Sequence, residues 1–317
     1  MNSILKTSLR LTALSLSCAS VAAFANVNPS TIYGTDSRKD LFEITNANTL
    51  KLADSTVALV KKTDVSFVGA TATLKTTPYG DSQGLCHAER FYDQSTAAFC
   101  SGSLVGPDLI LTAGHCVADA SDCSDTKFVF GFGIRVQGDH PETVKTDEVY
   151  QCAEIIKREQ DGNGADFAIV RIDRKVTRHS ILSLKRQATV VGGKLLVIGH
   201  PIGLPTKVAD GTVRTATSPG FFVTNLDTFA GNSGSAVFDA TSGEVEGILV
   251  RGDSDFTYNS DQGCMVSNVN PENGGRGEDV TKISAAAAAI DAYLTAAPVP
   301  APSSSPSPAP SHHATAK

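Results

Sequence analysis

Short apolar segments recur along most of the chain, and clusters of Gly, Pro, Asp and Ser separate them. Many are rich in β-branched residues or alternate apolar with polar positions, as in STVALV, FCSGSLV, LILTA, DFAIVRI, KLLVIG and GEVEGILVRG. Strands with one buried face produce this rhythm, and closely spaced turns favour a sandwich or a barrel. The pattern therefore predicts an all-β fold.

Helical periodicity is convincing in one place, the segment EDVTKISAAAAAIDAYLTAA at residues 278–297. Its larger apolar residues fall on one helical face: Val280, Ile283, Ala287, Ile290 and Leu294. We predict a C-terminal helix there. Residues 297–317 consist mainly of Pro, Ser and Ala and hold almost no large apolar side chain, so they are predicted to form a disordered tail.

The N-terminal residues 1–25 combine two basic residues, an apolar stretch and the small residues Ala23 and Ala25. This layout predicts a signal peptide cleaved after Ala25 and a secreted or periplasmic protein. The apolar stretch is too short and too rich in serine for a stable membrane span. A lipid anchor at Cys18 is a weaker alternative, because Ser15 stands where acylation favours an apolar residue. Residues 26–62 are predicted to be a pro-segment or an N-terminal arm.

Charge narrows the range of partners. The chain of 317 residues has a net charge of −6, which becomes −8 without residues 1–25 because two basic residues and no acid are lost. Nucleic-acid binding needs clustered Lys and Arg, and the sequence shows no such cluster. We expect no nucleic-acid partner, and we expect a monomer.

Six cysteines follow the predicted cleavage point: Cys86, Cys100, Cys116, Cys123, Cys152 and Cys264. An even number in an exported protein indicates disulfides. Neither a CxxC pair nor an HExxH motif occurs in the sequence. We therefore predict no thiol redox centre, no metal site and no cofactor.

Three segments carry candidate chemistry, in chain order LTAGHC with His115, GADFAIVRI with Asp166 and LDTFAGNSGSAV with Ser233. A serine hydroxyl becomes a good nucleophile when an imidazole takes its proton and a carboxylate orients that imidazole. Each segment alone is weak evidence, since Ser among glycines is usually a turn. The three together indicate a hydrolase.

These segments resemble a known family. FCSGSLVGPDLILTAGHCV is similar to the histidine segment of the chymotrypsin-like (trypsin-fold) serine proteases, and ADFAIVRI is similar to their aspartate strand. GNSGSAVF resembles the nucleophile loop of the bacterial branch, which includes the glutamyl endopeptidases, and the likeness extends over residues 54–269. The resemblance implies two six-stranded antiparallel β-barrels with the site between them. With the C-terminal helix, they would form a protease domain at residues 63–296.

The resemblance also implies roles for individual residues. His115 would be the general base, Asp166 its orienting carboxylate and Ser233 the nucleophile of a serine endopeptidase acting on proteins or peptides. The backbone N–H groups of Gly231 and Ser233 would form the oxyanion hole. The animal enzymes have an aspartate before the nucleophile that receives a new N-terminal amine on activation, and Asn232 stands there in this chain.

Disulfide pairing follows in part from the family. There, a bridge closes the loop that leads to the catalytic histidine, and Cys100 and Cys116 occupy its positions. The other four cysteines allow three pairings. We favour Cys123 with Cys152 because they are close in sequence, which leaves Cys86 with Cys264.

The resemblance further places the floor of the primary specificity pocket six residues before the nucleophile, at Asp227, with Gly252 and Gly263 on its walls. An acidic floor would favour Arg or Lys before the cut. Asp227 could instead accept hydrogen bonds from loop amides, as aspartates do in turns. Specificity for Glu or for apolar residues remains an alternative.

Two other functions are alternatives. An α/β-hydrolase esterase needs GxSxG and a histidine after its serine. Here the fifth position of GNSGS is serine, and the later histidines, His312 and His313, lie in the predicted tail. A protease-fold binding or adhesion protein without catalysis remains possible, although such proteins usually lack a member of the triad.

Overall fold

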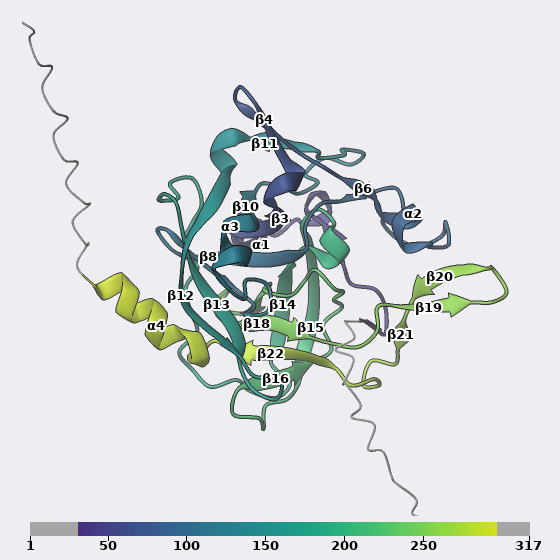
Figure 1. Cartoon of the computed structure of the whole chain (residues 1–317). Helices are drawn as coiled ribbons and strands as arrows, with labels where there is room; N and C mark the ends of the chain where they lie inside the picture. Colours follow the sequence, from purple (N-terminus) through teal and green to yellow (C-terminus); the bar gives the residue numbers. More distant parts are fainter. Residues whose placement is uncertain (1–30, 297–317) are drawn as a thin grey trace, which may run out of the picture.

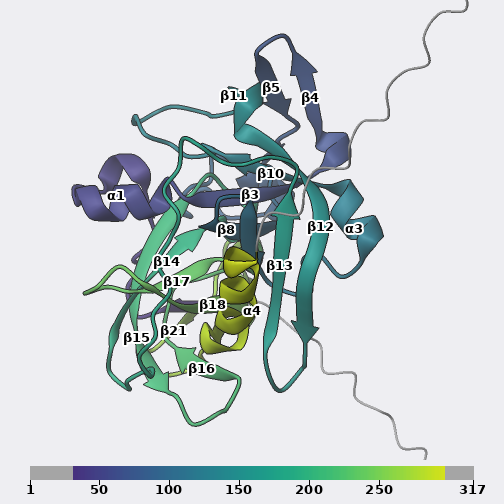
Figure 2. The same cartoon turned by 90° about the vertical axis from the view of Figure 1, so that its left-hand side faces the viewer.

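The computed structural model describes residues 31–296, which form two packed barrels of antiparallel strands (Figures 1 and 2). The predicted signal peptide at 1–25 and the predicted tail at 297–317 lie outside the described residues. In Figure 1 the first barrel occupies the upper half of the molecule and the second barrel the lower half.

The first barrel closes six strands in the order β10-β12-β13-β9-β8-β3. Their bounds are β3 Thr56–Lys61, β8 Cys100–Gly106, β9 Leu109–Thr112, β10 Thr126–Phe130, β12 Val149–Gln160 and β13 Asp166–Ile172. Strand β3 belongs to the stretch 26–62 that precedes the predicted domain boundary.

Alternation within β3 shows why this sequence forms a strand. Val57 and Leu59 belong to the largest apolar core, whereas Ala58 and Val60 belong to a second core with residues of β4 (Val65–Val68) and β5 (Thr71–Leu74). Successive side chains of a strand point to opposite faces, so a strand buried on both sides is apolar at every position.

The second barrel has the order β14-β17-β18-β22-β16-β15, and pairing of β14 with β15 closes it. Its strands are β14 Lys194–Gly199, β15 Lys207–Thr215, β16 Phe221–Thr224, β17 Ala236–Asp239, β18 Val245–Arg251 and β22 Glu278–Lys282. Two closed six-stranded antiparallel barrels confirm the predicted fold class.

One apolar core joins the barrels. In β17, Val237 faces the core of the second barrel, while Ala236 and Phe238 face the core that contains the first-barrel residues Leu104 and Phe167. Side chains on the outside of the second barrel thus pack against the first barrel. This contact fixes the position of any site to which both barrels contribute.

The C-terminal helix is shorter than the segment 278–297 that was predicted to form it. The helix α4 spans Ser284–Thr295, and the preceding residues form strand β22. Val280 packs inside the second barrel, while Leu294 is 46% exposed. Pairing of β22 with both β16 and β18 buries the β-branched residues of this segment and outweighs their helical spacing. Figure 2 shows α4 lying along β13.

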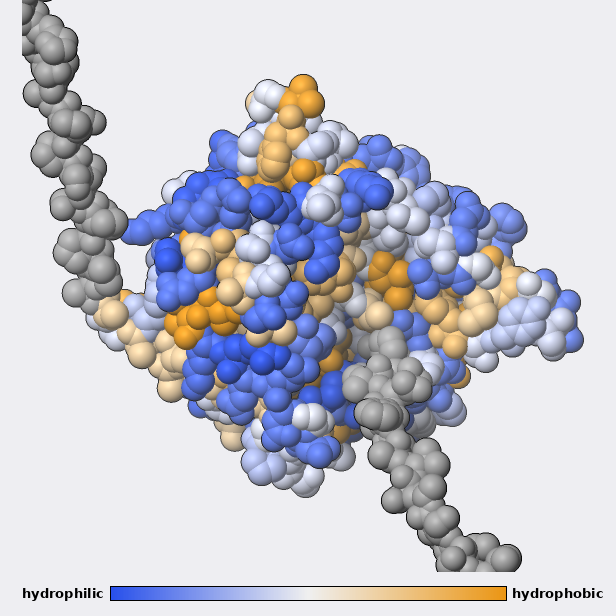
Figure 3. All heavy atoms as spheres, in the orientation of Figure 1, coloured by the Kyte–Doolittle hydropathy of each residue, from blue (hydrophilic) through white to orange (hydrophobic). Residues whose placement is uncertain are grey.

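Smaller elements decorate the barrels. Three short helices were not predicted: α1 Ala47–Ala53, α2 Tyr79–Gln83 and α3 Ala120–Asp125. The remaining strands are β1 Ile32–Tyr33, β2 Lys39–Asp40, β6 Thr77–Pro78, β7 Ser95–Thr96, β11 Thr143–Lys145, β19 Phe256–Asn259, β20 Cys264–Ser267 and β21 Val269–Asn270. Figure 3 shows orange atoms at the tip of the β4–β5 hairpin, where Val68 is 77% exposed. Within residues 31–296 no helix combines the length and the apolar character that a membrane span needs.

The N-terminal segment 31–46 packs on the second barrel. Strand β1 pairs in parallel with β21, and β2 pairs with β15. Asp40 and Lys207 form a buried ion pair with 2.6 Å between Oδ1 and Nζ. Arg38 is 1% exposed and binds Asp36 through Nε and Nη2. This segment is therefore built into the fold.

Three disulfides join Cys86 to Cys264, Cys100 to Cys116 and Cys123 to Cys152. These are the pairs favoured from the sequence. The first ties the α2 region to the β19–β20 hairpin, which projects at the right of Figure 1.

Candidate active site

His115 and Asp166 form a directly bonded pair. His115 follows β9, and Asp166 is the first residue of β13, which pairs with β9. Asp166 Oδ2 lies 2.8 Å from His115 Nδ1, and Oδ1 accepts the backbone N–H of His115 at 3.1 Å. Both carboxylate oxygens therefore hold the same residue. When Nδ1 carries the proton that it donates to Asp166, Nε2 of the neutral ring is unprotonated and can accept a proton from another group.

The surroundings of this pair explain the local sequence. Asp166 is 3% exposed, and its backbone N–H donates to Thr281 Oγ1 at 3.0 Å. The hydroxyl of Thr281 donates in turn to the carbonyl of Asp166 at 3.1 Å. A Cβ at Gly114 would lie 2.2 Å from the carbonyl oxygen of Glu159, so only glycine fits before His115.

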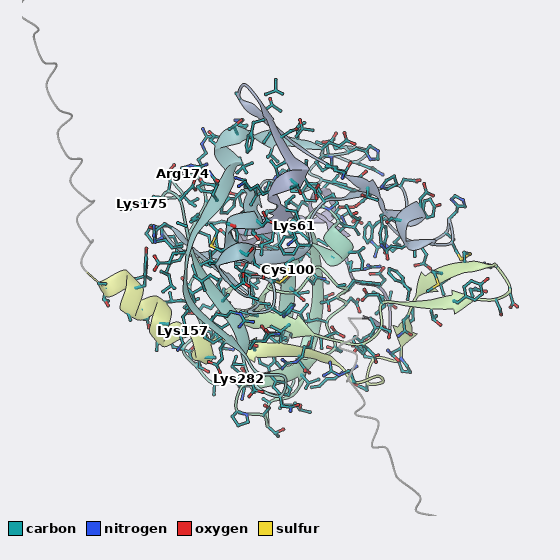
Figure 4. All side chains as sticks on the ribbon, viewed as in Figure 1. Lys61, Cys100, Lys157, Arg174, Lys175 and Lys282 are labelled. Carbon is teal, nitrogen blue, oxygen red and sulfur yellow. A yellow bond between two sulfur atoms is a disulfide. The ribbon has the colours of Figure 1, made fainter. Side chains whose placement is uncertain are left out.

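A disulfide holds the turn that carries His115. Cys100 begins β8, its bridge to Cys116 spans 16 residues, and Figure 4 places Cys100 centrally, where the barrels meet. The sulfur atoms and a ring nitrogen of His115 lie within 4.8 Å of one another, a spacing that suits a metal. Because a metal needs thiolates and these sulfurs are bonded to each other, the cluster offers no thiolate ligand.

Ser233 lies in a tight loop before β17. Gly231 and Gly234 have φ of +84° and +89°, a region that favours glycine. A Cβ at Gly234 would lie 2.1 Å from the carbonyl oxygen of Ser101. The backbone of Ser101 donates to the carbonyl of Ser233 at 2.8 Å, and its hydroxyl donates to that of Gly231 at 2.8 Å. Ser101, on β8, thus attaches this loop to the first barrel.

A cavity of about 450 Å³ brings the three candidate residues together. His115, Asp166 and Ser233 line it, as do Gly231 and Gly252. A larger cavity of about 770 Å³, which Lys127, Lys145 and Arg174 help to line, has no histidine, serine or cysteine in its lining. The smaller cavity is therefore the candidate active site.

Two residues predicted for the specificity pocket lie outside this cavity. Asp227 Oδ1 accepts the backbone N–H of Tyr33 at 2.7 Å, and Oδ2 accepts the backbone N–H and the hydroxyl of Ser37, both at 2.7 Å. Three donors from the N-terminal segment thus hold Asp227 away from the cavity, although burial raises its pKa to about 6. Gly263 lies in the turn between β19 and β20. Gly252 lines the cavity.

Ser101 and Thr281 were missed from the sequence. Ser101 stands in the segment FCSGSLV and Thr281 in a segment assigned to a helix. No local pattern distinguishes them, because each acts on a residue more than 100 positions away, Ser101 on Gly231 and Thr281 on Asp166. Arg251, which also lines the cavity, binds Asp279, with 3.1 Å between Nε and Oδ2.

Comparisons with known proteins found matches to part of this chain. Residues 100–248 match the family model described as a trypsin-like peptidase domain. Snake venom serine protease 3 of Protobothrops jerdonii is 28% identical over 117 residues, which cover 36% of this chain and 43% of the venom protein. The match therefore spans less than half of that relative's length.

Solved structures that are similar to this chain include a Glu endopeptidase in complex with MPD, at 18% sequence identity and a TM-score of 0.48. That comparison covers 83% of this chain and 98% of the other. Another is the serine endoprotease from Yersinia pestis, at 16% identity and a TM-score of 0.46, covering 79% of this chain and 68% of the other.

Proposed function

We propose that this protein is a secreted serine endopeptidase. Its residues 100–248 match the trypsin-like peptidase domain. The observation that carries the proposal is the pair of contacts between His115 and Asp166 at the edge of a cavity that Ser233 also lines. A base, its orienting carboxylate and a hydroxyl are the parts that serine-dependent acyl transfer requires.

In the proposed reaction His115 acts as general base and then as general acid. Ser233 Oγ attacks the scissile carbonyl while Nε2 of His115 takes its proton, and Asp166 stabilises the resulting imidazolium. The imidazolium gives that proton to the leaving amine, which departs and leaves an ester on Ser233. A water molecule then attacks the ester, again losing a proton to His115, and releases the acid product and the free hydroxyl.

The backbone N–H groups of Gly231 and Ser233 are proposed to stabilise the tetrahedral oxyanion. The positive φ of Gly231 supports this role, because it turns the backbone in a way that a side chain would resist. Loss of one such donor lowers kcat by about 10²–10³ in enzymes of this kind.

Secretion and substrate preference belong to the same proposal. Three disulfides favour an oxidising compartment, in agreement with the predicted signal peptide. We propose proteins or peptides as substrates, cut after Arg or Lys. Since Asp227 is bound by the N-terminal segment, that preference has to rest on another acidic group.

A fluorophosphonate probe tests the catalytic assignment. The purified protein is expected to be labelled at neutral pH, whereas Ser233→Ala should remain unlabelled, because removal of the nucleophile costs about 10⁶ in rate. Ser124→Ala, which changes an exposed serine of α3, is the matched control and should label normally. An unlabelled wild-type protein that is folded would contradict the assignment and favour the non-catalytic alternative.

A further inference from the structure

The larger cavity, of about 770 Å³, shares no lining residue with the cavity of the candidate active site. On one side it is lined by the first barrel, through Lys127 of β10 and Val149 of β12. On the other side it is lined by the small sheet β11-β5-β4, through Phe67, Thr71 and Lys145. Figure 2 shows this sheet at the top of the molecule, above β10. The cavity therefore lies between the barrel and the sheet that covers part of it.

Lys127 occupies a position in β10 where an apolar side chain would be expected. Strand β10 pairs with β3 on one side and with β12 on the other, and all five of its residues are buried. Lys127 itself is 6% exposed. Val129, two residues further along, packs in a core with Ala72 of β5. Because alternate residues of a strand share a face, Lys127 points to the side of the barrel that the small sheet covers.

The protein supplies no direct partner for the ammonium group of Lys127. Among residues 31–296, the hydrogen bonds and ion pairs of lysine ammonium groups do not include one to Lys127. Burial lowers the pKa of Lys127 and the charge of Lys62 lowers it further, whereas the charge of Asp173 acts in the opposite direction. Lys127 is thus a buried cation whose three donors lack an acceptor from the described chain, an arrangement that costs free energy.

The other charged groups of the cavity leave it with an excess of positive charge. Three basic residues, Lys127, Lys145 and Arg174, line it together with two acids, Asp147 and Asp173. Arg174, labelled at the upper left of Figure 4, pairs with Asp173, and Arg178 pairs with Asp147. Lys145 is exposed on β11, and the ion pairs formed by lysines in the described part of the chain do not include it. Two lysines therefore remain without a carboxylate, in a protein whose net charge is −6.

Apolar side chains line the same cavity. Phe67, Ala70 and Val149 contribute to it, and Phe67 is 48% exposed. Covering the ring of Phe67 with an apolar group removes apolar surface from water, which is favourable by about 25 cal/mol per Å². An inorganic anion could bind the lysines but would leave this ring exposed. The combination of cations and apolar surface matches a ligand that has both an acidic and an apolar part.

We propose that this cavity binds a carboxylate joined to an apolar group. The ammonium group of Lys127 donates to the carboxylate, Lys145 adds a second positive charge, and the apolar group covers Phe67. A free organic acid and an acidic segment of another protein both offer this chemistry. The site goes beyond the proposed peptidase activity and does not depend on it.

Titration calorimetry with paired probes tests the site and separates the two sources. The protein is Ser233→Ala, so that no peptide is cut. Phenylacetate and the neutral 2-phenylethanol represent the free acid, while acetyl-Phe-Glu-amide and the neutral acetyl-Phe-Gln-amide represent the protein segment. We expect at least one of the two anions to bind and its neutral counterpart not to bind. Binding of neither anion, or equal binding of an anion and its neutral counterpart, would overturn the proposal.

Lys127→Met in the same background keeps an unbranched apolar side chain and removes the charge. We expect the affinity for the anion to fall about 10- to 100-fold, as for loss of a hydrogen bond to a charged group. Lys145→Met should weaken binding by about fivefold at most, because this lysine is exposed. Lys51→Met, which changes an exposed lysine of α1, is the matched control and should bind normally. Unchanged affinity in Lys127→Met would rule the proposed site out.

Protection of Lys127 from acetylation covers the case in which Lys127→Met does not fold. Ser233→Ala is treated with acetic anhydride with and without the anion that binds, and modified lysines are identified by mass spectrometry. The bound anion should reduce acetylation of Lys127 and leave that of Lys51 unchanged. Equal acetylation of Lys127 under both conditions would contradict the proposal. A protein that fails to react with fluorophosphonate would contradict the proposed function and leave this test unaffected.

Discussion

The loops that carry His115 and Ser233 are held by different kinds of interaction. A disulfide from Cys116 to Cys100 closes the His115 loop within the first barrel. The Ser233 loop depends on hydrogen bonds and on packing, since Asp227 accepts three hydrogen bonds from Tyr33 and Ser37. One half of the site is thus held by a covalent bond, and the other by hydrogen bonds, from Ser101 of the first barrel and from the N-terminal segment.

The two kinds of interaction stabilise the fold in different ways. A disulfide acts mainly by reducing the conformational entropy of the unfolded chain, and it persists in any oxidising compartment. Buried charges and hydrogen bonds act in the folded state, and their contribution depends on each partner being present. We therefore expect the two loops to respond to different perturbations, from substitutions in the N-terminal segment to changes of redox state or pH.

The largest effect is expected from Arg38→Ala. Arg38 is buried, pairs with Asp36 through two contacts, and its Cζ lies 4.1 Å from the ring centre of Phe229 in the Ser233 loop. Breaking a buried ion pair costs about 3–5 kcal/mol, so the free energy of unfolding in urea should fall by that amount. Lys39→Ala, at the exposed neighbouring position, is the control. Equal stability of the two variants would show that the segment does not support the loop.

A smaller effect is expected from the double variant Cys100→Ser, Cys116→Ser. Its bridge closes a loop with a sequence separation of 16 residues, and loss of such a bridge costs about 3 kcal/mol. Because His115 adjoins Cys116, kcat/KM should fall as well. The control, Cys123→Ser with Cys152→Ser, opens a loop with a separation of 29 and should lose stability while keeping activity. Full activity in the Cys100→Ser, Cys116→Ser variant would show that this disulfide does not position His115.

The smallest effect concerns pH. Burial raises the pKa of Asp227 from 3.8 to about 6, so the folded protein holds this proton more tightly than the unfolded chain does. Its contribution to stability is then complete below pH 3.8 and is lost as the pH rises through about 6. Relative to Asp227→Asn, wild type should lose at most about 3 kcal/mol of unfolding free energy across this window in a series of urea unfolding experiments. Asp261→Asn, at an exposed position, should follow wild type throughout. Parallel curves for wild type and Asp227→Asn would contradict the prediction.

The parts of the fold that could be predicted are those whose signals are local. The pattern of apolar residues in segments such as TVALVK and DFAIVRI identifies strands, because the burial of one or both faces of a strand determines which consecutive residues are apolar. His115 and Ser233 follow from motifs of a few residues, and the glycines near them mark places where a Cβ would collide. The short helices α1, α2 and α3 were missed because each is too short to show helical periodicity.

The parts that could not be predicted depend on distant partners. Counting back from Ser233 places Asp227 at a fixed position in the chain, but the donors that hold it come from Tyr33 and Ser37, about 190 residues away. The segment that begins at Glu278 has helical spacing, yet its neighbours in the sheet make it a strand.

Helix α4 follows the second barrel in the sequence but packs against the first barrel. Its residues Ala286 and Ile290 join the core that contains Leu104 and Phe167, and its Tyr293 hydroxyl reaches Asp108 at 3.4 Å. Until this helix arrives, the first barrel keeps part of its apolar surface open to water. A ribosome delivers the chain from its N-terminus, so it releases the strands of the first barrel before the helix that covers part of their apolar surface.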